Sequence, residues 1–193
     1  MAKRDKEKLI KIGQDLFSNQ GYHNTGTEEI LLKAEYPRSS FYYHFKSKEG
    51  FALKVLEDYG NNAEQYYRKI LSDEKLGSPL SRLKYFTHSM AEYFKKNKFK
   101  NECLIQKFSI ECAAINEVLG ESTNEQMNKV LNALKDCIEQ GQAENEIRND
   151  IEAMRLAEYF QAQWYGSFTL GRIRKDVSLF EANMKMAFNY LEG

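Results

Sequence analysis

The chain has 193 residues, of which 42% are hydrophobic and 29% charged, a balance typical of folded globular proteins. Its formal net charge of zero excludes an overall basic field for nucleic acid, although residues 1–54 carry ten Lys or Arg against seven Asp or Glu. With only two prolines, the sequence predicts an all-helical fold. No stretch approaches the ~20 apolar residues of a membrane span, and no apolar region follows the N-terminal MAKRDKEK, so we expect a cytoplasmic protein.

Apolar residues recur with helical periodicity nearly from end to end. A stripe that includes Leu9 and Phe17 predicts a first helix, which Gly21 ends. The next three expected helices cover about 27–34 with Thr25 or Thr27 as cap, then Pro37 to about His44, then a longer stretch capped by Ser47. The remaining five are expected at about 79–94 after the Gly77-Ser78-Pro79 break, 101–115, 123–143, 151–174 with Asn149-Asp150 as cap, and 178–192 with Ser178 as cap. Nine helices result, divided into an N-terminal domain (1–46) and a larger domain (47–193).

Residues 25–46, TGTEEILLKAEYPRSSFYYHFK, meet the requirement of a helix-turn-helix, in which a second short helix protrudes into a major groove. Arg38, Ser39 and Ser40 open that helix and have the size and polarity to reach base edges. Tyr42 and Tyr43 begin a run of polar groups suited to phosphates, which position a protein without reading sequence.

The run FYYHF can also be interpreted as an aromatic stripe of the core. Three consecutive residues, Tyr42, Tyr43 and His44, cannot all face inward on a helix that turns ~100° per residue. Phe41 and Phe45, four residues apart, are the expected inward pair. The pattern therefore favours a DNA-binding face over a core stripe.

The segment LFSNQGYHNTGTEEILLKAEYPRSSFYYHFKSKEGF resembles the N-terminal signature of the TetR family of regulators. In that signature a helix ending LF…GY precedes a Thr-started helix, a turn and a closing FYYHFxSKE, and the match covers about residues 9–56. The chain has Glu35 and Ser39 where the family usually has Gly, so the turn geometry and base preference are expected to differ locally. Taken together, residues and resemblance give this set of DNA contacts: Thr25, Thr27, Arg38, Ser39, Ser40, Tyr42, Tyr43, His44, Lys46 and Lys48.

The resemblance implies that the remainder of the chain binds an effector and dimerises. This region is rich in aromatic residues, which can line a small-molecule pocket in a helical bundle but can equally form ordinary core. The candidate pocket residues are Tyr66, Phe86, His88, Phe94, Cys103, Phe108, Trp164 and Phe168. His88 is the weakest of these, because a lone histidine on a helix is more often exposed or satisfied than a ligand.

The three cysteines are odd in number and form no CxxC pair, which argues against a disulfide framework or a zinc site. The segment ECLIQKFSIECA resembles a TetR sub-branch that includes electrophile-responsive repressors of reductase genes, in which the cysteine matching Cys103 can be the sensor. Nearby Lys100 and Lys107, and a helix start, favour a reactive thiolate at this position. Cys103 and Cys112 lie half a turn out of phase on one expected helix and cannot bridge within it. Cys103 can also be a small buried core residue.

The last two expected helices are the predicted dimer interface, because they combine small side chains with large apolar ones. The interface candidates are Ala157, Trp164, Gly166, Ser167, Phe168, Met186 and Tyr190. A helix-turn-helix protein needs two heads ~34–36 Å apart to meet successive major grooves, so a two-fold homodimer on a palindromic operator is expected.

The function predicted is that of a DNA-binding transcriptional regulator, a repressor released from its operator by a small-molecule or electrophile effector. Effector binding or thiol modification would displace the fourth helix and so change the spacing of the two heads. An activator, or a helical adaptor that keeps the scaffold without binding DNA, stays open as an alternative. We find no Gly-rich phosphate loop, HExxH, nucleophile motif or carboxylate pair, so neither an enzyme nor a bound metal or cofactor is expected.

Overall fold

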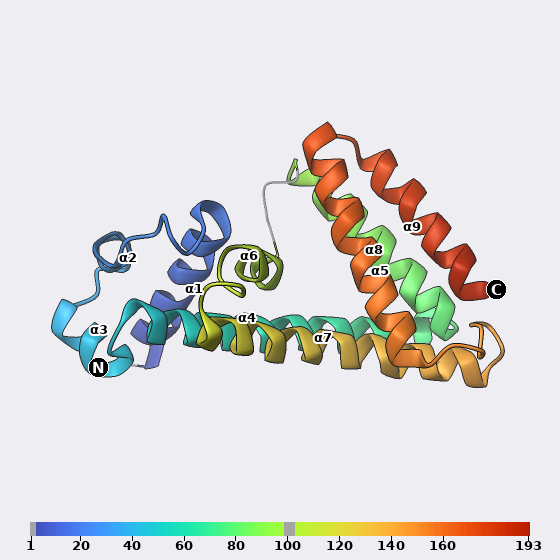
Figure 1. Ribbon diagram of the computed structural model, residues 1–193, viewed down its shortest axis with the longest axis horizontal. Coiled ribbons are helices and arrows are strands. Elements are labelled where there is room, and N and C mark those ends of the chain that lie inside the picture. The colour runs from blue at the N-terminus through green and yellow to red at the C-terminus, as the bar shows by residue number, and fades with distance from the viewer. Residues whose placement is uncertain (1–2, 99–102) are drawn as a thin grey trace. The chain divides into compact units, whose positions relative to one another are not determined.

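The computed structural model describes residues 3–98 and 103–193, and this part of the chain is all-helical, as predicted (Figure 1). It contains nine α-helices and a short 3₁₀ helix at Glu74–Leu76, with no strand among the described residues. The α-helices are α1 (Lys3–Gln20), α2 (Thr27–Ala34), α3 (Arg38–Phe45), α4 (Lys48–Leu71), α5 (Pro79–Lys96), α6 (Leu104–Glu111), α7 (Glu117–Ala143), α8 (Ala153–Arg174) and α9 (Val177–Glu192). No helix in the described ranges is long and apolar enough to cross a membrane.

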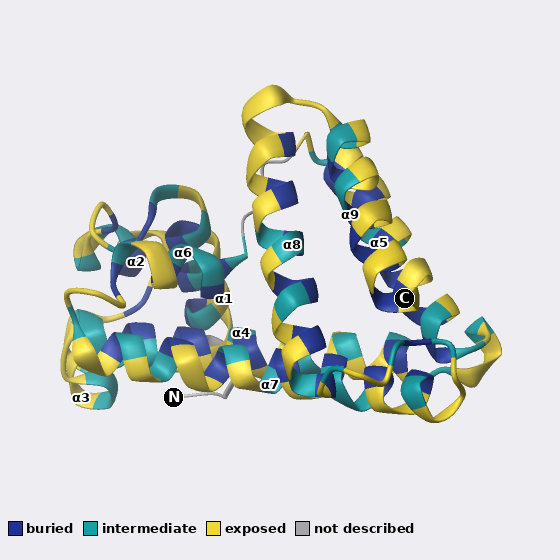
Figure 2. Cartoon of the chain, turned by 45° about the vertical axis from the view of Figure 1, so that its right-hand side comes forward, coloured by how far each residue is buried: buried dark blue, intermediate teal, exposed yellow. Residues whose placement is uncertain are grey.

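The helices form two compact units. The first comprises the described residues of 1–62 and 101–127, and the second those of 63–100 and 128–193. α4 and α7 therefore contribute their N-terminal parts to the first unit and their C-terminal parts to the second. Buried residues recur along one side of the helices in each unit (Figure 2). Residues 103–127, which the sequence analysis places in the larger domain, belong to the same unit as the N-terminal helices.

The first unit is built around fully buried phenylalanines from several helices. The ring of Phe51 in α4 lies 6.0 Å from that of Phe17 in α1 and 5.2 Å from that of Phe41 in α3, measured between centroids. Gly13 permits this packing, because a Cβ at that position would lie 2.6 Å from Phe51 Cζ. α6 closes the same core through Phe108, whose ring lies 5.6 Å from that of Phe17.

The second unit contains the rest of the buried aromatic residues and a buried arginine. Arg82 in α5 is 4% exposed, and its Nη1 donates to the Leu71 carbonyl at 2.8 Å while its Nη2 donates to Gln140 Oε1 at 3.0 Å. Leu71 is the last residue of α4, where helix carbonyls lack intrahelical partners. The guanidinium thus satisfies the C-terminus of α4 and ties it to α5 and α7.

Several helix starts differ from the expected positions or have other cap residues. α7 begins at Glu117 and not near 123, since Asn116 Oδ1 accepts from the backbone N–H of Leu119 at 2.9 Å. Asp176 and not Ser178 caps α9, accepting from the Ser178 N–H at 2.9 Å. The N-cap of α8 is Glu152 instead of the Asn149-Asp150 pair, and that of α2 is Gly26 instead of a threonine. The cap expected at Ser47 is confirmed, and Ser78 of the Gly77-Ser78-Pro79 break caps α5.

The expected helix at 101–115 is α6, Leu104–Glu111, with Cys103 as its N-cap and Cys112 as its C-cap. The two cysteines therefore flank the helix instead of lying within it. Residues 101 and 102, part of the expected helix, lie outside the described residues. The helix expected at about 79–94 is α5, which continues to Lys96.

The turn between α2 and α3 has a left-handed backbone at Glu35, although the replacement of glycine there was expected to change the turn geometry. Glu35 has φ 54° and ψ 41°, and its N–H donates to the Leu32 carbonyl at 3.2 Å while the Tyr36 N–H donates to the Leu31 carbonyl at 3.0 Å. A non-glycine residue in this region costs roughly 1–2 kcal/mol. The Glu35 side chain makes an ion pair with Lys8 at 3.3 Å. Both side chains are largely exposed, so this ion pair offsets little of the free-energy cost of the left-handed backbone.

We predict that Glu35→Gly raises the free energy of unfolding by about 1 kcal/mol, because glycine adopts positive φ without a Cβ penalty. Urea unfolding of the isolated chain measures the change. Glu35→Ala is the matched control: it also removes the Lys8 contact but keeps the strained backbone, so it should not stabilise. Equal stabilities of the Gly and Ala variants would contradict the assignment of strain to this residue.

Candidate functional site

α3 presents a polar face to solvent, because Phe41 is its only fully buried residue. Arg38, Ser39 and Tyr42 are exposed, and Tyr43 is 73% exposed. These positions follow the left-handed turn directly, so the N-terminal half of α3 protrudes with donors and acceptors at its surface. The arrangement fits a recognition helix, whose first residues reach base edges in a major groove.

Arg38 is held at this face by two contacts. Its guanidinium forms an ion pair with Glu28 in α2 and lies 5.5 Å from the centroid of the Tyr42 ring. Both members of the ion pair are mostly exposed, and pairs of this kind are worth about 0–1 kcal/mol. A nucleic-acid partner can therefore displace Glu28 at small cost.

The C-terminal end of α3 carries a histidine and a lysine. Lys46, at the end of the helix with φ 65°, donates from Nζ to the Tyr43 carbonyl at 2.9 Å and lies 5.4 Å from the centroid of the Tyr43 ring. His44 is half-buried, and the pKa of its imidazole is lowered by desolvation and by the charges of Lys6 and Lys46. Ser40 and Thr27 are also half-buried.

Two residues of the predicted DNA-contact set are turned into the first unit. Thr25 is fully buried, and its hydroxyl donates to the Gly21 carbonyl at 2.6 Å, so its side chain stabilises the α1–α2 loop. Lys48 Nζ lies 4.3 Å from the centroid of the Tyr22 ring, and partial burial lowers the pKa of this lysine. Its ammonium group therefore packs on the loop before α2.

A carboxylate that the sequence analysis did not single out anchors the same loop. Glu111, at the end of α6, accepts from the backbone N–H of Tyr22 at 2.8 Å, and its own carbonyl lies 3.2 Å from His23 Nε2. Asn116 Nδ2 donates to Glu49 Oε2 in α4 at 2.7 Å. The contact between Tyr22 and Glu111 joins positions 89 residues apart, so no local sequence pattern predicts it.

The predicted effector residues of the second unit form one packed aromatic cluster. The ring of Trp164 in α8 stacks on Phe86 at 5.2 Å and lies 5.9 Å from Phe94, while Phe94 lies 4.4 Å from Phe168. All four are nearly fully buried. Tyr66 joins them at the surface: its ring lies 6.1 Å from Phe86, and it is 43% exposed.

The other predicted pocket residues are placed differently. Phe108 belongs to the core of the first unit and packs on Phe17 and Tyr22. His88 is exposed on α5 and lines a separate groove between α5 and α9. Cys103 is half-buried in the first unit. The structure therefore brings together five of the eight predicted residues, all of them in the second unit.

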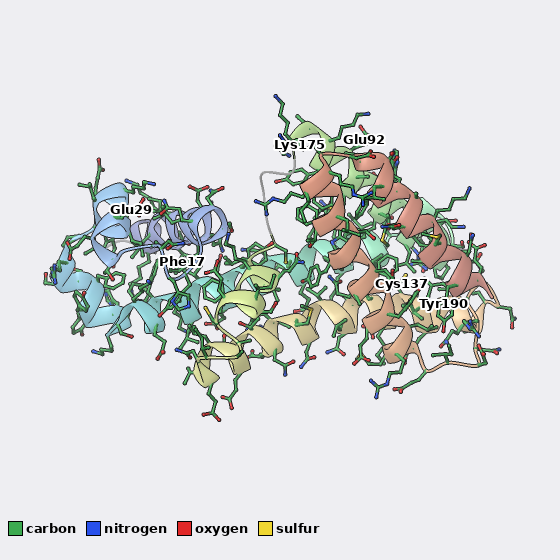
Figure 3. All side chains as sticks on the ribbon, turned by 45° about the horizontal axis from the view of Figure 1, so that its top comes forward. Phe17, Glu29, Glu92, Cys137, Lys175 and Tyr190 are labelled. Carbon is green, nitrogen blue, oxygen red and sulfur yellow. The ribbon has the colours of Figure 1, made fainter. Side chains whose placement is uncertain are left out.

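The three cysteines differ in accessibility. Cys112 and Cys137 are buried, and desolvation raises the pKa of each thiol to about 11. Figure 3 shows Cys137 among the helices of the second unit, where its Sγ lies 3.5 Å from the Pro79 carbonyl oxygen. Both thiols are therefore protonated at neutral pH and shielded. Cys103 is the only one of the three cysteines that is not buried. Lys107, which was expected to favour its thiolate, pairs with Glu111 at 3.9 Å. Lys100 lies outside the described residues.

The predicted dimer residues divide into buried and exposed sets. Ala157, Trp164, Ser167 and Phe168 pack inside the second unit, whereas Gly166, Met186 and Tyr190 are exposed. Leu170 and Ile173, which were not predicted, extend the exposed apolar side of α8, and Ile173 is 72% exposed. Tyr190 is fixed between the ring of Tyr159 at 4.6 Å and the guanidinium of Arg148 at 4.8 Å.

The described helices, with a left-handed turn before an exposed polar helix, fit the helix-turn-helix class of DNA-binding regulators. Residues 9–55 match the family described as "Bacterial regulatory proteins, tetR family", and residues 79–187 match "Tetracyclin repressor-like, C-terminal domain". The chain belongs to the TetR family of bacterial transcriptional regulators. It is thus a DNA-binding transcriptional regulator and not an enzyme.

Proteins similar in sequence or in structure match nearly the whole chain. The transcriptional repressor DhaR of Mycobacterium sp. strain GP1 is 26% identical, over 96% of this chain and 91% of its own length. The crystal structure of a regulatory protein TetR from Rhodobacter sphaeroides has a TM-score of 0.86 at 24% identity, covering 96% of this chain and 97% of that one. The reduced form of NemR from Escherichia coli has a TM-score of 0.85 at 24% identity, covering 96% of each chain. Both structural likenesses show the shared fold.

Proposed function

We propose that the chain is a homodimeric cytoplasmic repressor that binds a palindromic operator through α3 and is released by an effector. The observation that carries this proposal is the exposed face of α3, with Arg38, Ser39 and Tyr43 directed to solvent after the Glu35 turn. Residues 1–46 act as the DNA-binding domain and residues 47–193 as the effector and dimerisation domain. DhaR, which is similar to this chain over 91% of its own length, is a repressor, and this supports repression as the function of this chain.

We assign the proposed DNA contacts according to which side chains are exposed to solvent. Arg38, Ser39 and Ser40, at the start of α3, read base edges. Tyr42, Tyr43, His44 and Lys46 contact phosphates, which fix the position of the helix on the duplex. Thr27 is a further candidate at the start of α2, whereas buried Thr25 and inward-packed Lys48 support the loop that holds the two helices.

The proposed dimer surface is the exposed apolar side of α8 and α9. Met186 is 61% exposed, and Tyr190, Leu170 and Ile173 add apolar area beside Gly166, whose missing side chain permits close approach. Large apolar side chains left in water favour burial against a second copy. A two-fold dimer supplies the two recognition helices that two successive major grooves require.

The proposed effector site is the aromatic cluster of Tyr66, Phe86, Phe94, Trp164 and Phe168. Its rings already fill the space between them, so an effector has to part them, and the half-exposed Tyr66 marks the point of entry. Separation of rings on α5 and α8 also displaces the end of α4, because Arg82 ties the Leu71 carbonyl to α5. The shift requires an effector that binds the displaced state more tightly than the DNA-bound one.

A second proposed input is covalent modification of Cys103 by electrophiles. Cys103 caps α6, and the other end of this eight-residue helix holds the α1–α2 loop through Glu111. An adduct at the N-cap disturbs the start of α6 and so its contacts with the loop before the DNA-contacting helices. The chemical basis for selectivity is that Cys112 and Cys137 are buried with raised pKa values.

We predict that Arg38→Ala weakens binding to the preferred operator by about 1–3 kcal/mol and relaxes its base preference, because a base-reading arginine is lost. Operator sequences come from selection on random DNA, and fluorescence anisotropy measures affinity across salt concentrations. Lys46→Ala should weaken all sequences alike and reduce the salt slope by about one. Lys175→Ala, an exposed lysine of the second unit, is the control. A chain that selects no sequence and shifts no DNA would disprove the proposed function.

We predict that operator affinity rises as the pH falls from about 7.5 to about 5.5 through protonation of His44. In the free chain the pKa of His44 is lowered, so the imidazole is neutral at pH ~7. A phosphate beside it favours the imidazolium, so binding takes up a proton, and the gain is lost as the pH rises. His44→Gln should flatten the pH profile, whereas His88→Gln should leave it unchanged. If the affinity of His44→Gln still depends on pH in the same way, the proton taken up on binding belongs to another group.

We predict that N-ethylmaleimide labels Cys103 in the folded chain and releases operator DNA, and that Cys103→Ser binds DNA normally but no longer responds. Peptide mass spectrometry locates the adduct, and anisotropy follows release. Cys137→Ala is the matched control and should respond as the wild type does, since this thiol is buried. Release of DNA from labelled Cys103→Ser would show that Cys103 is not the sensor.

A further inference from the structure

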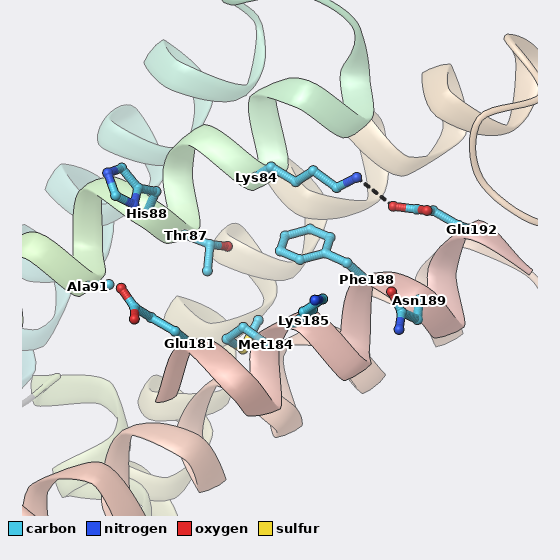
Figure 4. Close-up of a pocket in the computed structure, with 10 residues that line it drawn as sticks. All are labelled: Lys84, Thr87, His88, Ala91, Glu181, Met184, Lys185, Phe188, Asn189 and Glu192. Atoms are coloured by element: carbon cyan, nitrogen blue, oxygen red, sulfur yellow. Dashed lines mark hydrogen bonds and ion pairs between the residues drawn. The ribbon is translucent and has the colours of Figure 1, made fainter. Parts of the chain in front are cut away.

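A groove of about 430 Å³ lies between α5 and α9, apart from the aromatic cluster (Figure 4). Its floor is apolar and consists of Thr87 and Ala91 from α5 and Met184 and Phe188 from α9, all of them buried. The Thr87 hydroxyl donates to the Leu83 carbonyl at 3.0 Å within its own helix. The groove exists because the two α5 residues are small, and its volume is in the range of small-molecule sites, roughly 300–1,000 Å³.

One end of the groove is closed by a charge pair. Lys84 Nζ lies 2.5 Å from Glu192 Oε1 and 5.8 Å from the centroid of the Phe188 ring (Figure 4). These two charges already have each other as partners in the free chain, although both side chains are exposed. The remaining charged side chains of the lining are Glu181 and Lys185, which stand on consecutive turns of α9.

Glu181 and Lys185 are the charges that a ligand meets. Neither forms an ion pair within 4.0 Å with another residue of the described ranges, although their spacing of four positions would allow one. Asn189 and His88 add polar groups to the rim. A single acid would meet the Glu181 carboxylate as well as the Lys185 ammonium, and a single amine the reverse. A ligand that carries both charges satisfies both side chains.

We propose that this groove binds a small zwitterion with an apolar side chain, a molecule of the amino-acid class. Its carboxylate pairs with Lys185, its ammonium group pairs with Glu181, and its apolar part lies on Met184 and Phe188. The site is distinct from the proposed effector cluster, and the proposal does not depend on DNA binding.

The test uses the chain without DNA and three probes of matched shape: L-phenylalanine, 3-phenylpropanoate, which lacks the ammonium, and 2-phenylethylamine, which lacks the carboxylate. The methionines carry a ¹³C-methyl label, and NMR follows the Met184 methyl, identified by its loss in Met184→Leu. Met186 is the internal control, because it lies on the same helix but points to solvent outside the groove lining.

L-Phenylalanine should shift the Met184 signal with saturation and leave Met186 unchanged. Each single-charge probe should bind about fivefold more weakly, as should L-phenylalanine to Glu181→Gln or Lys185→Gln. Both substitutions are at exposed positions, and circular dichroism checks that the helices are retained. An unmoved Met184 signal would overturn the site, and equal affinity for all three probes would overturn the zwitterion assignment. Failure of operator binding in the separate DNA assay would leave these results unaffected.

Discussion

The contact between Phe41 and Phe51, at 5.2 Å between ring centroids, decides where α3, the proposed recognition helix, lies. α3 has only eight residues, and a helix this short is marginal by itself in water. Phe45 adds a second ring 5.1 Å from Phe51, so α3 is held on α4 by one side alone. The opposite side is left with polar residues in solvent, which is the property that a DNA-reading helix needs. The same Phe51 ring packs on Phe17 in α1, so one side chain sets three helices against each other.

Both ends of this helix carry backbone strain. Glu35 before it and Lys46 after it both have positive φ, and neither is a glycine. Each therefore costs free energy that the aromatic core has to offset. In return, the chain turns sharply before and after α3, so that this helix protrudes between α2 and α4. Glycine at position 50 permits the exit, because a Cβ there would collide with the carbonyl oxygen of Phe45.

The sequence alone was sufficient for the number of helices, the helix-turn-helix and the inward direction of Phe41, because these depend on local periodicity and turn residues. It was insufficient where a contact with a residue distant in sequence determines the position of a side chain. Thr25 resembles a surface cap, yet its hydroxyl is buried under the loop that Glu111 anchors from α6. Phe108 looked like a pocket wall because its neighbours in sequence belong to the predicted effector domain, whereas its ring packs on Phe17. Periodicity identifies the inward side of a helix but not the unit toward which that side faces.

The place of α6 in the first unit changes the account of how a signal would reach DNA. If α6 belonged to the effector domain, a change at Cys103 would have to pass along α4 to the recognition helix. Instead, Cys103 and Glu111 lie at opposite ends of a helix roughly 12 Å long, by the helical rise per residue. Glu111 holds the Tyr22 backbone, and Lys48 at the start of α4 packs on the Tyr22 ring. A disturbance at the thiol therefore has a direct route through packed groups to both helices that flank the proposed DNA-reading surface, without repacking the aromatic cluster of the second unit.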